Sequence, residues 1–193
     1  MKFAPKLIIA EKYNMRDSIM IDWFKKGESA KNNDNPFEAF IYLWISWMIG
    51  CKIYIAYNYN QNENNGTTDR EDLIIWCEDN SSAVSQIIEE NYSSLCVLGK
   101  RKGESTQTPI IDTTNRKLTQ RFNSLSKFFK NEYSYKNDKD LAIDFGELLN
   151  KIRNNLFHGG KSYNHKKDLE LINAVLPTLY EFAKEGVEYS KDL

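Results

Sequence analysis

The chain has 193 residues and an almost balanced charge, with 26 Lys and Arg against 27 Asp and Glu. The length suits one domain, and a hydrophobic fraction of 41% is enough for a buried core. The net charge of -1 excludes a generally basic protein, so any nucleic-acid site must rest on local clusters of Lys and Arg. The three cysteines, Cys51, Cys77 and Cys96, form no CxxC pair. They argue against a disulfide scaffold or a zinc site and favour a reducing, cytoplasmic setting.

The first third of the chain predicts two helices. Apolar residues recur at helical spacing over 12–26, and Gly27 predicts the end of that helix. The second helix, 36–57, has a proline in its first turn and Asn35 as its cap. It is apolar nearly all round, as in a membrane span or in the central helix of a bundle. Lys52 lies inside it and favours the buried helix, with the lysine stem extended to the surface.

Two polar stretches in the middle of the chain predict exposed loops. One is the Asn-rich stretch 58–68, and the other is the charged stretch 100–108. Short helices are expected between them, with caps at Thr68 or Asp69 and at Ser81. Helical spacing returns over 114–130, where basic residues surround an apolar stripe. The apolar run near the N-terminus, 7–10, is too short for the core of a signal peptide.

The C-terminal part predicts two long helices. Asp138 or Asp140 caps the first, which ends at His158 before two glycines. A short linker leads to the last helix, over about 168–189. The short linker and two apolar stripes predict that these helices pack as an antiparallel pair. The only strand-like alternation is over 52–59, which continues a helical pattern, so we expect a single all-α domain over 1–193.

Three polar residues at the end of the first of these helices are the strongest candidates for a functional site. Arg153, Asn154 and His158 lie in the string RNNLFHGGK. Histidine exchanges protons near neutral pH, and arginine carries a permanent planar cation suited to phosphate. Asn154 and His158 are four residues apart and share a helix face, which the long Arg153 side chain can also reach. Such residues also interact favourably with a helix C-terminus, so a purely structural role is the alternative.

This string resembles the signature of the HEPN superfamily. That signature is an arginine, often followed by a polar residue such as asparagine, and then a histidine about four to six residues on. Here four residues separate Arg153 from His158. The HGGK extension, the long apolar helix and the late position of the motif are similar to HEPN families of bacterial toxin and phage-defence type. The clear resemblance covers about 60 C-terminal residues, and it implies an HEPN-like helical bundle.

The resemblance implies a metal-independent endoribonuclease without a cofactor, acting at a composite site between two protomers of a homodimer. Carried over, His158 would act in acid–base catalysis, Arg153 would stabilise charge on the scissile phosphate, and Asn154 would orient the phosphate or the imidazole. The implied products carry a 2′,3′-cyclic phosphate and a 5′-hydroxyl. A toxin or defence role with an antitoxin partner is also implied. Toxins paired with nucleotidyltransferase antitoxins often carry a tyrosine two residues after the histidine, where this chain has Gly160, so no antitoxin type is favoured.

Basic residues beyond the motif are candidates for contacts with the RNA backbone, and those nearest to it are Lys161, Lys166 and Lys167. His158 and His165 make a poor ligand pair, since no cysteine or HExxH pattern accompanies them, and no metal site is expected. The expected partners are therefore RNA and a second copy of the chain, without a membrane. Two other functions stay open. One is a non-catalytic HEPN-fold module that binds a nucleotide, RNA or a protein, and the other is a helical scaffold.

Overall fold

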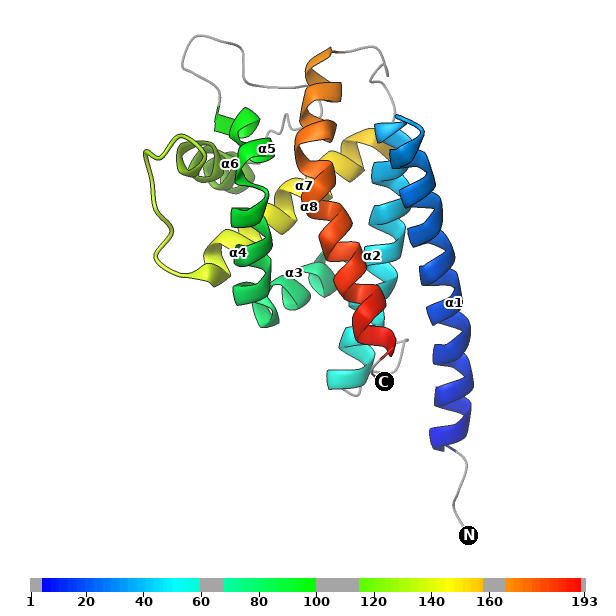
Figure 1. Cartoon of the computed structure of the whole chain (residues 1–193). Helices are drawn as coiled ribbons and strands as arrows, with labels where there is room; N and C mark the ends of the chain where they lie inside the picture. Colours follow the sequence, from blue (N-terminus) through cyan, green and yellow to red (C-terminus); the bar gives the residue numbers. More distant parts are fainter. Residues whose placement is uncertain (1–4, 60–67, 100–114, 158–165, 192–193) are drawn as a thin grey trace.

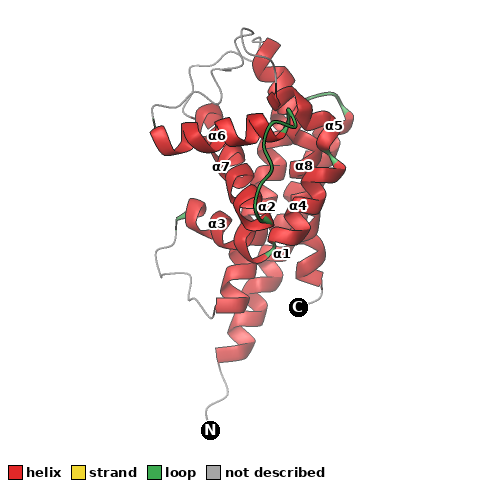
Figure 2. Cartoon of the chain, turned by 90° about the vertical axis from the view of Figure 1, so that its left-hand side faces the viewer, coloured by secondary structure: helices red, strands yellow, loops and turns green. Residues whose placement is uncertain are grey.

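A computed structural model describes residues 5–59, 68–99, 115–157 and 166–191, although the side chains of residues 5–15 and of Lys167 lie outside this description. These segments contain helices and connecting loops and no strand (Figures 1 and 2), which confirms the predicted all-α class. The two predicted loops fall mostly outside the described residues. In chain order the helices are α1 (Pro5–Asn32), α2 (Pro36–Tyr59), α3 (Asp69–Asp79), α4 (Ser81–Glu90), α5 (Tyr92–Leu95), the 3₁₀ helix η1 (Cys96–Gly99), α6 (Arg116–Phe128), α7 (Asp138–Phe157) and α8 (Lys166–Lys191).

Helices α1 and α2 form an antiparallel hairpin in which a glycine allows a close approach. The prediction that Gly27 ends the first helix is wrong, because α1 continues to Asn32. Gly27 instead faces the fully buried Leu43 of α2, where an added Cβ would lie 2.6 Å from the Leu43 Cγ. Further along the hairpin the Ser46 hydroxyl donates to the Met20 carbonyl at 3.0 Å. The glycine therefore serves helix packing rather than helix termination.

We expect Gly27→Ala to lower the free energy of unfolding by about 1–2 kcal/mol in a urea titration. Overpacking a buried contact costs about 1–3 kcal/mol, which exceeds the gain of about 1 kcal/mol from the higher helix propensity of alanine. The matched control is Gly186→Ala, where the nearest atom to the added Cβ, the Gly50 Cα, is 3.5 Å away. That variant should be as stable as the wild type or slightly more stable. Equal stability of both variants would contradict the packing role of Gly27.

Helix α2 is the buried centre of the bundle, as predicted. It lies between α1 and α8 (Figure 1), and residues along its whole length are buried. Among the described helices it alone is long and apolar enough to cross a membrane, but 61% of that apolar window is buried inside the protein. The Lys52 side chain is 42% exposed, which confirms that it reaches the surface from this apolar helix. These features match the central helix of a bundle.

An aromatic cluster joins α2 to α3, α7 and α8. The Trp47 ring lies 5.4 Å from Trp76 of α3 and 5.2 Å from Phe182 of α8, measured between centroids. Phe182 in turn lies 6.1 Å from Phe145 of α7. Trp47 is fully buried, and Trp44 and Trp76 are nearly so. These tryptophans therefore belong to the core and not to a base-stacking surface.

Helices α7 and α8 do not form the closely packed antiparallel pair that the sequence predicts. Among the described helices, α8 lies along α2, whereas α7 lies against α3, α4 and α6 and crosses α8 (Figure 1). The side chains of α7 and α8 still meet at Phe145 and Phe182. The reason is that α2 offers apolar surface to the stripe of α8. On α7, Gly146 allows α3 to approach closely, because an added Cβ there would lie 2.8 Å from the Cys77 Sγ.

Helix caps follow the predicted pattern with shifts of one position. Asn35 accepts a bond from the third residue of α2 at 3.4 Å, and Thr68 caps α3, as predicted. At α7 the cap is Asn137 rather than either of the two aspartates predicted, because its side chain accepts a backbone N–H at 2.9 Å. Ser81 is the first residue of α4, and Asn80 holds the cap position without a side-chain bond.

Candidate functional site

The last two turns of α7 carry a polar face. Asn150, Arg153, Asn154 and Phe157 follow the spacing that places residues on one side of a helix. Of the apolar residues between them, Ile152 is buried in the core, and Leu156 is partly buried and packs against it. Asn150 is buried as well, whereas Arg153 and Asn154 are half-buried and Phe157 is exposed. The amphipathic pattern of α7 therefore presents polar groups at the rim of the core.

These side chains hold one another in place. The Arg153 Nη1 donates to the Asn154 Oδ1 at 2.8 Å, and the Asn154 Nδ2 donates to the Asn150 Oδ1 at 3.4 Å. The Arg153 guanidinium also lies over the Phe157 ring, 5.0 Å from its centroid. Its Nε is buried and has no hydrogen-bond partner among the described residues. The guanidinium is thus held by an amide and a ring from its own helix.

The N-terminus of α3 faces this part of α7, and a capping box fixes where α3 begins. The Thr68 hydroxyl accepts the Glu71 N–H at 3.2 Å, and the Glu71 carboxylate accepts the Thr68 N–H at 2.8 Å. The bond from the Thr68 N–H, and after it a bond that the Thr68 hydroxyl donates to the same carboxylate at 3.1 Å, lower the pKa of the Glu71 carboxyl. The box places Asp69 at the first position of α3, where a carboxylate is favoured by the helix dipole.

One carboxylate connects α3 to both α7 and α2. The Asp69 Oδ2 lies 3.7 Å from the Arg153 Nη2, and the Asp69 Oδ1 lies 2.9 Å from the Lys52 Nζ. The Lys52 Nζ is also 3.7 Å from an oxygen of the buried Asp72. Burial by itself lowers the pKa of Lys52, but the two aspartates raise it overall. Lys52 therefore stays a cation, and three helices meet at a cluster of two cations and two carboxylates.

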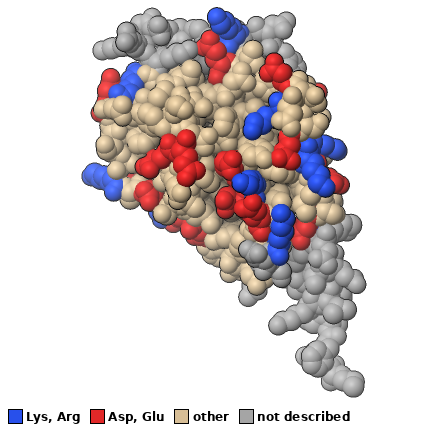
Figure 3. Space-filling model, in the orientation of Figure 1, with Lys and Arg blue, Asp and Glu red and all other residues tan. Residues whose placement is uncertain are grey.

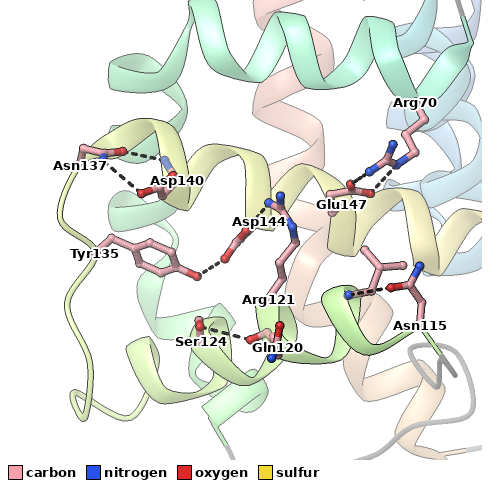
Figure 4. Close-up of polar contacts among 11 residues, drawn as sticks. Arg70, Asn115, Gln120, Arg121, Ser124, Tyr135, Asn137, Asp140, Asp144 and Glu147 are labelled. Carbon is pink, nitrogen blue, oxygen red and sulfur yellow. Dashed lines mark hydrogen bonds and ion pairs between the residues drawn. The ribbon is translucent and has the colours of Figure 1, made fainter.

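An ion pair between the exposed Arg70 and the buried Glu147 fixes α3 against α7 beside this cluster (Figure 4). The Arg70 Nε donates to a Glu147 carboxylate oxygen at 3.1 Å, and the Arg70 Nη2 pairs with the other oxygen. The Glu147 side chain is only 1% exposed, so it depends on this partner. At the opposite end of the contact, Lys139 of α7 pairs with Glu78 of α3. The two helices are therefore antiparallel and attached at both ends.

A second network attaches α6 to α7 and shares no residue with the first. The Arg121 Nη1 donates to the Asp144 Oδ1 at 2.6 Å, and the Tyr135 hydroxyl donates to the other oxygen at 2.9 Å (Figure 4). Burial raises the pKa of the Asp144 carboxyl, although both partners act to lower it. Burial and then the charge of Asp144 raise the pKa of Tyr135 well above its usual range. Tyr135 is therefore a donor here, and the network has a structural role.

The structure brings together two of the three predicted catalytic residues. Arg153 and Asn154 are hydrogen-bonded to each other. His158, which follows the last residue of α7, lies outside the described residues, as does Lys161. Lys166 is exposed at the start of α8, and nothing is described of the Lys167 side chain.

Three charged neighbours of the motif have roles that the sequence does not predict. The sequence predicts Lys52 only as a lysine that reaches the surface and Asp69 as a possible cap, and it predicts no role for Glu147. A signal was present for Glu147, since it lies between Phe145 and Leu148 on a helix whose apolar residues are buried. A carboxylate at such a position needs a cationic partner. Nothing in the sequence identifies Arg70 as that partner.

The charges of this region are balanced rather than basic. In the cluster and in the ion pair beside it, Lys52, Arg70 and Arg153 face Asp69, Asp72 and Glu147. Acidic and basic side chains are also interspersed on the face of the molecule seen in Figure 3. Among the described residues, no group of three His, Cys, Asp or Glu side chains could hold a metal ion. The site offers fixed, partly exposed cations, each with an acidic partner.

Known proteins give no further guide to this arrangement. Comparison of the chain with protein-family models, with curated proteins and with solved structures gives no match. A function must therefore be argued from the motif and from the geometry around it.

Proposed function

We propose that the chain is an endoribonuclease of HEPN type that cleaves RNA without a metal ion, at a site built around Arg153, Asn154 and His158. The observation that carries the proposal is the placement of Arg153. Its guanidinium is held by Asn154 at 2.8 Å on the last turns of α7, the helix that His158 directly follows in the chain, and its side chain is 30% exposed. A fixed planar cation and a proton-exchanging group five residues further along the chain suit the cleavage of a phosphodiester.

The proposed reaction uses the 2′-hydroxyl of the RNA as the nucleophile. His158 removes the 2′ proton while the oxygen attacks phosphorus, and the bond from phosphorus to the 5′-oxygen breaks. The departing 5′-oxygen takes a proton from the protonated His158 of a second copy. Arg153 stabilises the negative charge that grows on the phosphate oxygens, and Asn154 keeps the guanidinium aligned. The products carry a 2′,3′-cyclic phosphate and a 5′-hydroxyl.

A homodimer belongs to this proposal because one arginine and one histidine per chain make a sparse active site. A two-fold axis near the end of α7 would bring two copies of the motif to one RNA strand. Lys161, Lys166 and Lys167 would contact the RNA backbone, since phosphate contacts provide most of the affinity for nucleic acids. We further propose that the protein acts in the cytoplasm as a toxin or defence effector, held in check by an antitoxin protein.

The test is cleavage of total RNA with and without EDTA, followed by analysis of the ends. We expect cleavage to persist in EDTA, because the proposed chemistry uses only side chains. The 5′ ends should accept phosphate from a polynucleotide kinase without prior phosphatase treatment. The 3′ ends should resist poly(A) polymerase until the cyclic phosphate is opened and removed.

Two results would contradict the proposal. Cleavage that stops in EDTA and returns with magnesium would exclude the metal-independent mechanism. Binding of RNA without cleavage, under every activating condition, would favour the non-catalytic binding module instead. The pairing of Arg153 with Asp69 gives that second function some support, because it partly neutralises the cation.

A further inference from the structure

Lys52 is an unusual residue for the helix that carries it. Helix α2 has only two charged residues in 24, Glu38 in its first turn and Lys52 in its second half. A lysine in the central helix of a bundle is costly unless its ammonium reaches water or a partner. Here the ammonium reaches both, and its partner is the carboxylate that also faces Arg153. The lone cation of α2 is therefore directed to the motif.

Lys52 and Arg153 share Asp69 as a partner, and both stay accessible to an incoming polyanion. The side chains of Lys52, Asp69 and Arg153 are 42%, 45% and 30% exposed. Ion pairs as exposed as these contribute little to stability, so they exchange readily. Phosphate oxygens form stronger, charge-assisted bonds with guanidinium and ammonium groups. A phosphate that enters here can replace Asp69 at both cations.

We infer that Lys52 is a second phosphate-binding residue of the proposed RNA site, and that Asp69 pairs with Lys52 and Arg153 in the free protein and competes with RNA for both. This inference rests on the proposed function, which it deepens by adding a cation from α2 to a site otherwise formed by α7. Arg153 contacts the scissile phosphate, and Lys52 contacts a phosphate of the same strand. A ligand therefore occupies the two cations only if it binds them more strongly than Asp69 does.

The competing explanation is that Lys52 only fastens α2 to α3. The two roles differ in what they change. A structural lysine alters stability, whereas a phosphate-binding lysine alters the dependence of RNA affinity on salt concentration. Each phosphate contact on a single strand contributes about 0.7 to the slope of log affinity against log salt concentration.

The experiment measures binding of a short 2′-O-methyl RNA, which lacks the nucleophile and cannot be cleaved, at several salt concentrations. We expect Lys52→Gln to weaken binding about three- to tenfold at low salt and to reduce the slope by about 0.7. Lys52→Arg, which keeps the charge, should retain most of the affinity. Asp69→Asn should tighten binding because it removes the carboxylate that competes with RNA. Helix α3 should still begin at the same place, since the cap and box residues Thr68 and Glu71 remain. Thermal unfolding of each variant reports any structural loss.

The matched control is Lys139→Gln. Lys139 also links α3 to another helix through a partly exposed ion pair, but with Glu78 at the opposite end of α3. It removes the same charge from the protein, so an effect of net charge alone would appear there too. We expect RNA affinity and slope to match those of the wild type.

The outcomes separate this inference from the proposed function. Wild-type cleavage together with unchanged binding by Lys52→Gln would overturn the inference and leave the ribonuclease in place. A slope that depends on Lys52 in a protein that cleaves nothing would support the inference and refute the enzyme. Weaker binding by Asp69→Asn would overturn the competition. Absence of RNA binding by the wild type would overturn both.

Discussion

Replacement of His158 by alanine is expected to abolish RNA cleavage and to leave the fold intact. General acid–base catalysis contributes about 10²–10⁴-fold, and in the proposed homodimer both the base and the acid are copies of this residue. The core that the structure describes is formed by other residues, and the buried residues of α7 end at Ile152. The loss should therefore appear in the cleavage rate and not in thermal unfolding.

His165 provides the matched control, because it is the only other histidine of the chain. We expect His165→Ala to cleave a defined RNA at a rate close to that of the wild type. The comparison should be made with enzyme in excess over RNA, so that binding differences do not mask the chemical step. Equal rates for His158→Ala and the wild type would end the catalytic assignment of His158.

The parts of this fold that could be predicted are those encoded locally. The apolar sequence of 36–57 predicts a buried helix wherever it is placed, and α2 is that helix. The cap at Thr68 depends only on the first residues of its own helix. Arg153 and Asn154 are adjacent in the chain, so their hydrogen bond needs no tertiary information. The structure that such local patterns encode is retained in the folded protein, because few distant contacts oppose it.

The choice of helix partners could not be predicted, because an apolar stripe shows that a helix is buried but not against what. The stripe of α8 suited α7 or α2 equally well in the sequence, and the structure pairs it with α2. Gly27 shows the same ambiguity. A glycine signals either a helix end or a close approach, and only the neighbouring Leu43 decides between them.

The residues that surround the motif in space also could not be predicted from the sequence. Asp69 and Lys52 come from helices far from Arg153 in the chain, and the antiparallel contact of α3 with α7 brings them together. That contact is fixed by Arg70 and Glu147, a pair that no local pattern links. The motif therefore identifies Arg153 but not Asp69, the carboxylate that pairs with it.

The geometry of Arg153 predicts that a lysine cannot replace it. We expect Arg153→Lys to lower the rate of RNA cleavage about 10²–10³-fold, the usual cost of removing a donor that stabilises transition-state charge. The guanidinium bonds Asn154 through Nη1, faces Asp69 through Nη2 and lies over Phe157 at the same time. A lysine keeps the positive charge but presents one ammonium, which cannot make the three contacts together.

Unfolding should not explain this loss, because the partly exposed pair with Asp69 contributes at most about 1 kcal/mol to stability. Single-turnover cleavage and thermal unfolding should be measured for Arg153→Lys, Arg153→Ala and the control Lys151→Ala. Lys151 lies on the same helix two positions earlier, and its removal should change the rate little. Because charge alone would attract the RNA phosphate, Arg153→Lys should differ more in cleavage rate than in affinity from the wild type, whereas Arg153→Ala should also bind RNA more weakly. An Arg153→Lys protein as active as the wild type would show that charge is enough and that the planar fork has no part in catalysis.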